Sequence, residues 1–181
     1  MKSFKISVVF LVLMISGCGS STESGSAFND EDVMFAQMMI PHHEQAIELV
    51  EMAENPATEA GPDLISLAAQ IKNAQGPEIN LMKNFLQSWD QPVSGHSSMG
   101  HGSTMKGILS GEELKKLSSL SGNAFEKEWL LSMTAHHEGA IEMAKSVERD
   151  GANSEVRLFA AEIISSQNAE IKLMKTMLAK L

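Results

Sequence analysis

Apolar residues recur at every third or fourth position through four segments of the chain, which is the spacing of α-helices that bury one face. The first segment runs from about residue 29 to an Asn-Pro stop at 55–56, and the second runs from a Gly-Pro-Asp start at 61–63 to about residue 90. The third begins at Asn123, where Glu126 is expected to complete a capping box, and ends at Gly151. The fourth runs from about Ser154 to residue 181. Short connections within each pair predict two antiparallel hairpins.

The chain after residue 28 therefore predicts an all-α, ferritin-like four-helix bundle at 29–181. It consists of a first hairpin at 29–88, a long connection at 89–122 and a second hairpin at 123–181. The connection is too long for a simple bundle loop, and a short helix is expected in it after Ser110, with Glu113 as its capping-box partner. Pro41 is expected to kink the first helix, and Gly76-Pro77 is expected to break the second.

The two predicted hairpins repeat each other in sequence. The pattern His-His-Glu-x-Ala-Ile-Glu occurs at 42 and again at 136, and Gln75-x-x-Glu78 recurs as Gln167-x-x-Glu170. A duplicated hairpin that packs on itself with pseudo-twofold symmetry would bring both histidine pairs to a shared middle. The prolines of the first half have no counterpart in the second, so a site built there need not be symmetric.

The first residues predict export. Lysines precede an apolar run at 6–15 that is too short for a retained membrane helix, and the run ends in Ile15-Ser16-Gly17-Cys18. This ending resembles the lipobox of bacterial lipoproteins. We therefore expect a signal peptide at 1–17, a lipid on Cys18 that anchors the protein to a membrane, and a flexible tether at 18–28. An ordinary secretory signal is the alternative. The expected location is the cell envelope, at the periplasmic face of the outer membrane if the host is Gram-negative.

Charge and cysteine content exclude several classes of function. The formal net charge is −9, so nucleic acid, whose phosphates need a basic surface, is not an expected partner. The single cysteine allows neither an intramolecular disulfide nor a thiolate metal site. Any transition-metal chemistry must therefore use His, Met, Asp or Glu side chains.

Methionine and histidine combine in the two repeated segments. In each copy a methionine lies three residues before the first histidine of the pair and four before the second, so its thioether can stack against either imidazole on a helix. Thioether and imidazole are soft ligands that suit copper, Cu(I) above all. The predicted metal ligands are Met39, His42, His43, Met133, His136 and His137. Adjacent histidines are turned by about 100° around a helix, so one of each pair should face the bundle centre and the other a flanking helix.

Two further groups of residues accompany these ligands. Among glycines and serines in the connection stand four soft side chains that we expect to act as accessory metal ligands: His96, Met99, His101 and Met105. Four polar residues on the inner faces of the second and fourth helices are expected to orient the imidazoles from behind: Gln75, Glu78, Gln167 and Glu170.

Two alternatives to copper binding stay open. The histidines and glutamines can form a buried polar layer with a purely structural or interaction role, hydrogen-bonded within the core. A ferritin-like di-metal oxidase is a second alternative, although it needs Glu-x-x-His pairs and none occurs here. Zinc is less favoured than copper because it does not seek thioethers, and no His-Glu-x-x-His motif is present.

At these residues the chain resembles the bacterial family called domain of unknown function 305, whose ferritin-like bundles carry Met-Ile-x-His-His motifs. The segment 39–43 matches that motif closely, while 133–137 has Thr and Ala in place of the usual Ile and Pro. Both Gln-x-x-Glu patterns also match, and the resemblance covers about residues 30–181. The family includes a cyanobacterial periplasmic copper-binding protein, and this implies copper as the cofactor.

The sequence thus predicts a lipid-anchored envelope protein that binds copper, as Cu(I) or Cu(II), for sequestration, resistance or delivery. Its expected partners are the metal ion, the membrane and copper-handling envelope proteins. Nothing in the sequence requires catalysis, although a site open to redox chemistry could also oxidise Cu(I). The oligomeric state cannot be read from the chain.

Overall fold

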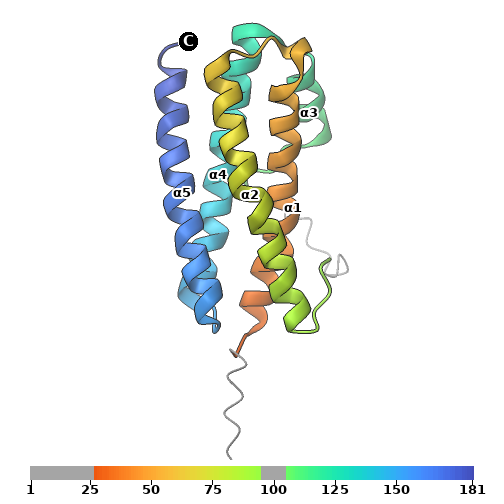
Figure 1. Cartoon of the computed structure of the whole chain (residues 1–181), viewed down its shortest axis with the longest axis vertical. Coiled ribbons are helices and arrows are strands. Elements are labelled where there is room, and N and C mark those ends of the chain that lie inside the picture. The colour runs from red at the N-terminus through yellow and green to blue at the C-terminus, as the bar shows by residue number, and fades with distance from the viewer. Residues whose placement is uncertain (1–26, 95–104) are drawn as a thin grey trace, which may run out of the picture.

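Four long helices run side by side in the computed structural model, which describes residues 27–94 and 105–181 (Figure 1). They are α1 (Asp30–Glu54), α2 (Pro62–Ser88), α4 (Gly122–Asp150) and α5 (Ser154–Leu178). A single 3-10 turn, η1 (Pro56–Thr58), links α1 to α2, and the short helix α3 (Gly111–Ser118) precedes α4. The predicted all-α bundle of two hairpins is confirmed.

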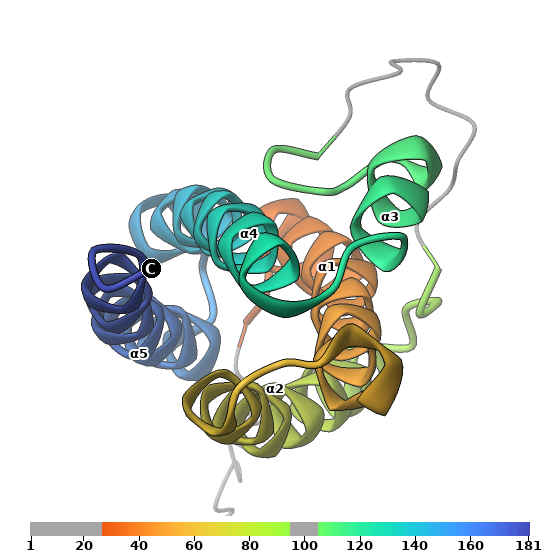
Figure 2. The ribbon, with the colours of Figure 1, turned by 90° about the horizontal axis from the view of Figure 1, so that it is seen from above.

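Seen from above, each hairpin forms one side of the bundle, and the hairpins meet through α1 and α4 (Figure 2). Helix α3 and the segment before it lie outside the four long helices. The predicted signal peptide, Cys18 and nearly all of the tether lie outside the described residues. Within 27–94 and 105–181, no helix is both long and apolar enough to cross a membrane.

Helix α1 begins with a capping box and an acidic first turn. The Asn29 side chain accepts a hydrogen bond from the Asp32 backbone N–H, and the Asp32 carboxylate accepts one from the Asn29 backbone N–H. The same carboxylate oxygen accepts from the N–H groups of Ala152 and Asn153 at 3.0 Å each, in the turn between α4 and α5. Asp32 thus joins one hairpin to the other.

The expected capping box at Asn123 is wrong. Helix α4 starts one residue earlier, with Ser121 as its N-cap, and no side chain caps it. The Glu126 carboxylate instead accepts a hydrogen bond of 2.6 Å from the backbone N–H of Gly61, at the start of α2. The N–H groups at the start of α2 have no partners within the helix and attract this carboxylate. The hydrogen bond from Gly61 is a second link between the hairpins. The expected capping box between Ser110 and Glu113 is present at the start of α3.

The break expected at Gly76-Pro77 is also wrong, because α2 continues through Pro77 just as α1 continues through Pro41. A proline removes only one helical hydrogen bond, and packing along a buried face supplies most of the stability of a helix in a protein. Both halves consequently present uninterrupted helices to the middle of the bundle.

The apolar core consists of two clusters. One contains Met39 and Phe35 of α1 with Met82 of α2, and the other contains Met133 and Trp129 of α4. The histidine pairs lie next to these methionines in sequence and belong to neither cluster. The polar side chains therefore form a layer between two apolar regions, with one methionine buried on each side of it.

Candidate metal centre

His42 of α1 and His136 of α4 face each other where the two hairpins meet. Their ring centroids are 3.8 Å apart, the ring planes are inclined by 43°, and the two residues are 0% and 1% exposed. Because the two residues occupy equivalent places in the repeat, the contact lies at the predicted pseudo-twofold centre. The shared middle expected from the duplicated motif is therefore formed by this pair.

His43 and His137 turn away from that centre toward the second helix of their own hairpin. The Nε2 atom of His43 lies 2.8 Å from a carboxylate oxygen of Glu78 on α2, and that of His137 lies 2.7 Å from Glu170 on α5. Both histidine side chains are fully buried, while the glutamates reach the surface with 19% and 18% of their side chains exposed. The split within each pair follows the turn of about 100° between adjacent helical residues.

Burial keeps the central pair neutral. Loss of hydration, with a smaller effect of the neighbouring His43, lowers the pKa of His42 from 6.5 to about 3, although the Lys106 carbonyl opposes the shift. Loss of hydration also holds the pKa of His136 well below 6.5, with contributions from His42 and His137. Neutral imidazoles have a free lone pair, which is the form that binds metal ions.

Several buried polar atoms of this layer have no hydrogen-bond partner among the described residues. These atoms are the Nδ1 nitrogens of all four histidines, Nε2 of His136, both side-chain polar atoms of Gln75 and Oε1 of Gln167. The hydrogen bonds that Gln75 was expected to supply in a purely structural layer are therefore not formed within this part of the chain. Unpaired buried nitrogens are unfavourable unless a ligand completes them. Imidazole nitrogens, together with the thioethers of the two methionines buried on the same helices, are a donor set that fits copper.

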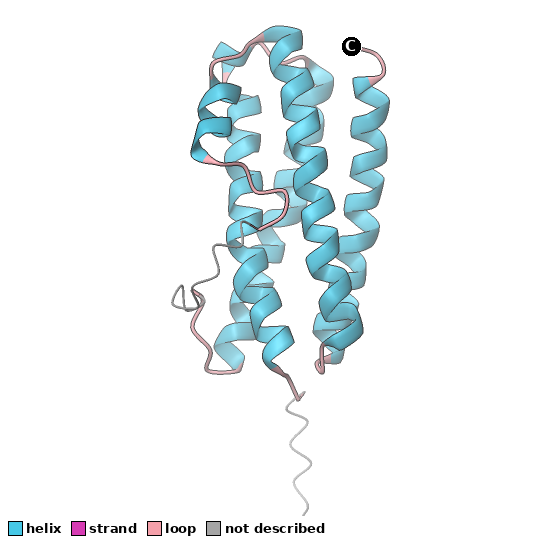
Figure 3. Ribbon diagram, turned by 180° about the vertical axis from the view of Figure 1, so that it is seen from behind, coloured by secondary structure: helices cyan, strands magenta, loops and turns pink. Residues whose placement is uncertain are grey.

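A short segment covers the centre from outside. Residues 105–109, here called the strap, lead into α3 and lie beside α1 and α4 (Figure 3). The Lys106 carbonyl oxygen lies 3.4 Å from Nε2 of His42. The Gln45 side chain holds the strap at Leu109 by two hydrogen bonds, donating to its carbonyl at 2.9 Å and accepting from its N–H at 2.8 Å.

Two glycines allow this close approach. Gly107 has a φ of +83°, and a β-carbon there would lie 2.4 Å from the Ala135 carbonyl oxygen. A β-carbon on Gly139 of α4 would lie 1.8 Å from the Lys106 carbonyl oxygen. The strap was not predicted from the sequence, although two glycines in these positions are the signal for a close backbone contact.

The remaining predicted ligands are distributed as follows. Met39 and Met133 are both fully buried beside the histidine layer. Met105 is partly buried at the start of the strap, whereas His96, Met99 and His101 lie outside the described residues. Within the described residues, no three side chains among His, Cys, Asp and Glu group as a metal site.

Residues 32–178 match the family described as Domain of unknown function (DUF305). The chain belongs to this family. Among curated protein sequences, none matches it significantly.

Solved structures of DUF305 proteins share the fold. A putative secreted DUF305 protein from Streptomyces coelicolor is 30% identical, with a TM-score of 0.75 over 83% of this chain and 93% of that one. A DUF305 fragment from Deinococcus radiodurans is 31% identical, with a TM-score of 0.73 over 85% and 99%. CopM in its Cu(I)-bound form is 33% identical, with a TM-score of 0.69 over 82% and 96%. The predicted resemblance to DUF305 is thereby confirmed.

Proposed function

We propose that this DUF305 protein binds copper, as Cu(I), at the histidine layer between α1 and α4. The contact between two buried, neutral imidazoles, His42 and His136, is the observation that carries the proposal. Their nitrogens are available without loss of a proton at neutral pH. Similarity to CopM, which has been crystallised with Cu(I), Cu(II) and silver, supports a soft metal.

Sulfur completes the proposed ligand set. Because no group of three His, Cys, Asp or Glu side chains in the described residues is arranged to hold an ion, the histidines need thioether partners from Met39 and Met133. Cu(I) accepts such soft ligands and low coordination numbers, which favours it over Cu(II), zinc and iron. Glu78 and Glu170 would fix the rings of His43 and His137, as carboxylates behind metal-binding histidines commonly do.

The proposed setting is the bacterial envelope. The lipobox-like ending at Cys18 would place a lipid anchor ahead of the bundle, and the His/Met segment from His96 to Met105 would collect ions for the centre. Sequestration or delivery to copper-handling envelope proteins fits this site better than turnover, because the buried central histidines are closed to a substrate from solution.

A structural polar layer is the second candidate, and one observation favours it. The two His–Glu hydrogen bonds give His43 and His137 partners without a metal. They leave the central pair unexplained, however, since His136 has no partner for either ring nitrogen among the described residues.

Anaerobic titration of the protein against a chromogenic Cu(I) chelator, with metal analysis, separates these candidates. We expect tight uptake in the wild type and an affinity roughly ten- to a hundredfold weaker in the variant with Met39→Leu and Met133→Leu. Each substitution removes a proposed sulfur ligand, while leucine fills a similar volume in the core. The matched control carries Met52→Leu and Met177→Leu, two partly buried methionines away from the histidine layer, and should bind as the wild type does. Equal affinity in both variants would contradict the proposal. Uptake of iron with oxygen consumption would favour the di-metal oxidase instead.

A further inference from the structure

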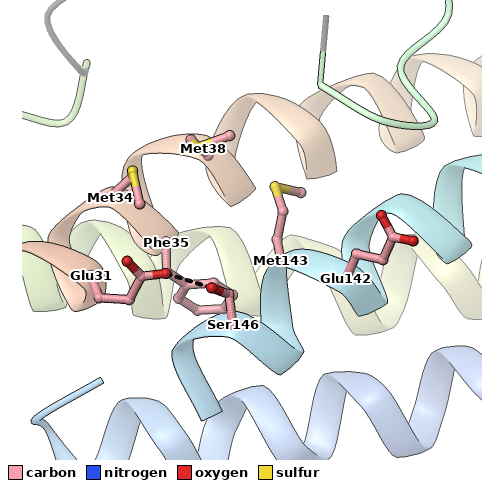
Figure 4. Close-up of a pocket in the computed structure, with 7 residues that line it drawn as sticks. All are labelled: Glu31, Met34, Phe35, Met38, Glu142, Met143 and Ser146. Carbon is pink, nitrogen blue, oxygen red and sulfur yellow. Dashed lines mark hydrogen bonds between the residues drawn. The ribbon is translucent and has the colours of Figure 1, made fainter. Parts of the chain in front are cut away.

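A surface pocket lies between α1 and α4, beyond the histidine layer toward the start of α1. Its volume is about 280 Å³. It is lined by Glu31, Met34, Phe35, Met38, Glu142, Met143 and Ser146. Figure 4 shows Met34 and Met38 projecting from α1 and Met143 projecting from α4. Three of the seven lining residues are therefore methionines contributed by two helices.

These methionines are accessible, unlike Met39 and Met133. Met34 is 47% exposed, and Met38 and Met143 are partly exposed. On α4 the buried core position is taken by Ala144, and its neighbour Met143 is only partly buried. Met34 and Met38 are four residues apart and so share a face of α1. Three flexible thioether side chains consequently line one pocket that solvent reaches.

The rim of this pocket is acidic and partly fixed. The Ser146 hydroxyl of α4 donates a 2.7 Å hydrogen bond to the Glu31 carboxylate of α1, which bridges the two helices. Glu142 is 56% exposed and forms an ion pair with Lys106 of the strap. Carboxylates near thioethers raise the local concentration of cations, while the sulfur atoms select soft ones.

We propose that Met34, Met38 and Met143 form a second, surface site for a soft monovalent cation such as Cu(I) or Ag(I). This site is separate from the buried histidine layer and has no imidazole. It lies on the same pair of helices as His42 and His136, and Glu142 ties its rim to the strap that covers His42. Such a site would take up metal directly from solution and hold it more weakly than the buried centre.

The test is an Ag(I) titration of the full chain followed by NMR of 13C-labelled methionine methyl groups. The variant with Met34→Leu, Met38→Leu and Met143→Leu identifies the three signals. In the wild type we expect these signals to shift together with one binding curve. In the triple variant one Ag(I) fewer should bind at saturation, as counted by native mass spectrometry.

Two comparisons keep this site distinct from the buried centre. The variant with Met39→Leu and Met133→Leu should retain the three coupled shifts, even if the buried centre proves not to bind metal. In the single variant Met143→Leu, the Ag(I) concentration at which the Met34 and Met38 signals are half shifted should rise at least about tenfold, because one of three ligands is lost. The proposal is overturned if the three signals stay unmoved while Ag(I) binds elsewhere, or if each methionine responds independently of the other two.

Discussion

The central imidazoles make the stability of the protein sensitive to acid. His42 and His136 have a lower pKa in the folded chain than in the unfolded chain, so the unfolded state binds more protons once the pH falls below about 6.5. Their titration therefore has no effect on stability well above that pH and destabilises the folded state increasingly as the pH falls, for His42 until the pH nears 3. We expect the free energy of unfolding to fall between pH 6 and 5 by roughly 1 kcal/mol for each of these histidines.

Urea denaturation at pH 7, 6 and 5 measures this effect. The variant with His42→Asn and His136→Asn isolates it, because the other titrating groups are unchanged. Its free energy of unfolding should depend less steeply on pH than that of the wild type. Parallel curves for the two proteins would show that the central pair is not the source of the acid sensitivity.

The carboxylates behind the outer histidines are open to a second test at this scale. Glu78→Gln keeps the shape of the side chain but removes the charge that faces His43. We expect Cu(I) affinity, measured by chelator competition, to fall by roughly ten- to a hundredfold, as for other residues that orient metal-binding histidines. Glu44→Gln is the matched control, since Glu44 is exposed and paired with Lys83. An equal loss of affinity in both variants would contradict the orienting role.

The residues of the histidine layer could be predicted from the sequence, but not all of their partners could. The duplicated motif identified both histidine pairs, and helical spacing pointed to Glu78 and Glu170 behind them. The carbonyl of Lys106 and the methionines at 34 and 38 were missed. A backbone carbonyl has no residue type to reveal it, and exposed methionines on a helix resemble ordinary surface residues.

At the scale of elements, the position of the strap depends on its close contact with Gly139 of α4. Gly139→Ala would place a methyl group against the Lys106 carbonyl, so the strap must move away from α4 and from His42. We expect this substitution to destabilise the protein by about 1–3 kcal/mol, as overpacking commonly does. It should also speed amide hydrogen exchange at Leu109, whose N–H donates to Gln45 in the wild type.

Gly76→Ala provides the matched control for that experiment. Gly76 also lies inside a helix, but nothing stands within 4 Å of the place where its β-carbon would be. Alanine there should be neutral or should stabilise α2 by about 0.5–1 kcal/mol through its higher helix propensity. Similar losses in both variants would mean that the close contact with the strap does not govern the effect.

The helices could be predicted well because their apolar spacing and their stop signals agree. The expected ends at Asn55 and Gly151 match the observed ends of α1 and α4. The errors concern contacts made by tertiary structure. Glu126 serves another helix rather than its own, and Pro77 is tolerated because the buried face of α2 packs without interruption.

At the scale of the whole molecule, a polar layer separates two apolar clusters and costs stability when no metal is bound. Replacing both members of the central pair, by His42→Leu and His136→Leu, removes unpaired buried nitrogens. We expect the metal-free protein to become more stable by about 1–3 kcal/mol while copper uptake is lost. His43→Leu should have the opposite effect on stability because it leaves Glu78 without its partner. Thermal melts of the metal-free proteins decide between these outcomes, and a lower melting temperature for the double variant would refute the first.

The pseudo-twofold arrangement of the bundle was predictable from the internal repeat, whereas the way the halves are fastened was not. Asp32 accepts from two backbone N–H groups in the turn after α4. Trp129 of α4 donates a 2.7 Å hydrogen bond to the Leu49 carbonyl of α1. Each contact joins segments about 80 or more residues apart in the sequence, and no local sequence pattern predicts such contacts.

The two tryptophans occupy different clusters, and this gives the protein built-in optical reporters. Trp129 is fully buried in one cluster, whereas Trp89 packs against the other in a partly exposed stack with Phe28 and Phe85. The chain has no tyrosine, so its near-ultraviolet fluorescence comes from these two indoles. Emission from Trp129 should be blue-shifted relative to that from Trp89. Fraying at the Phe28 end can therefore be followed separately from opening of the opposite end, with no added label.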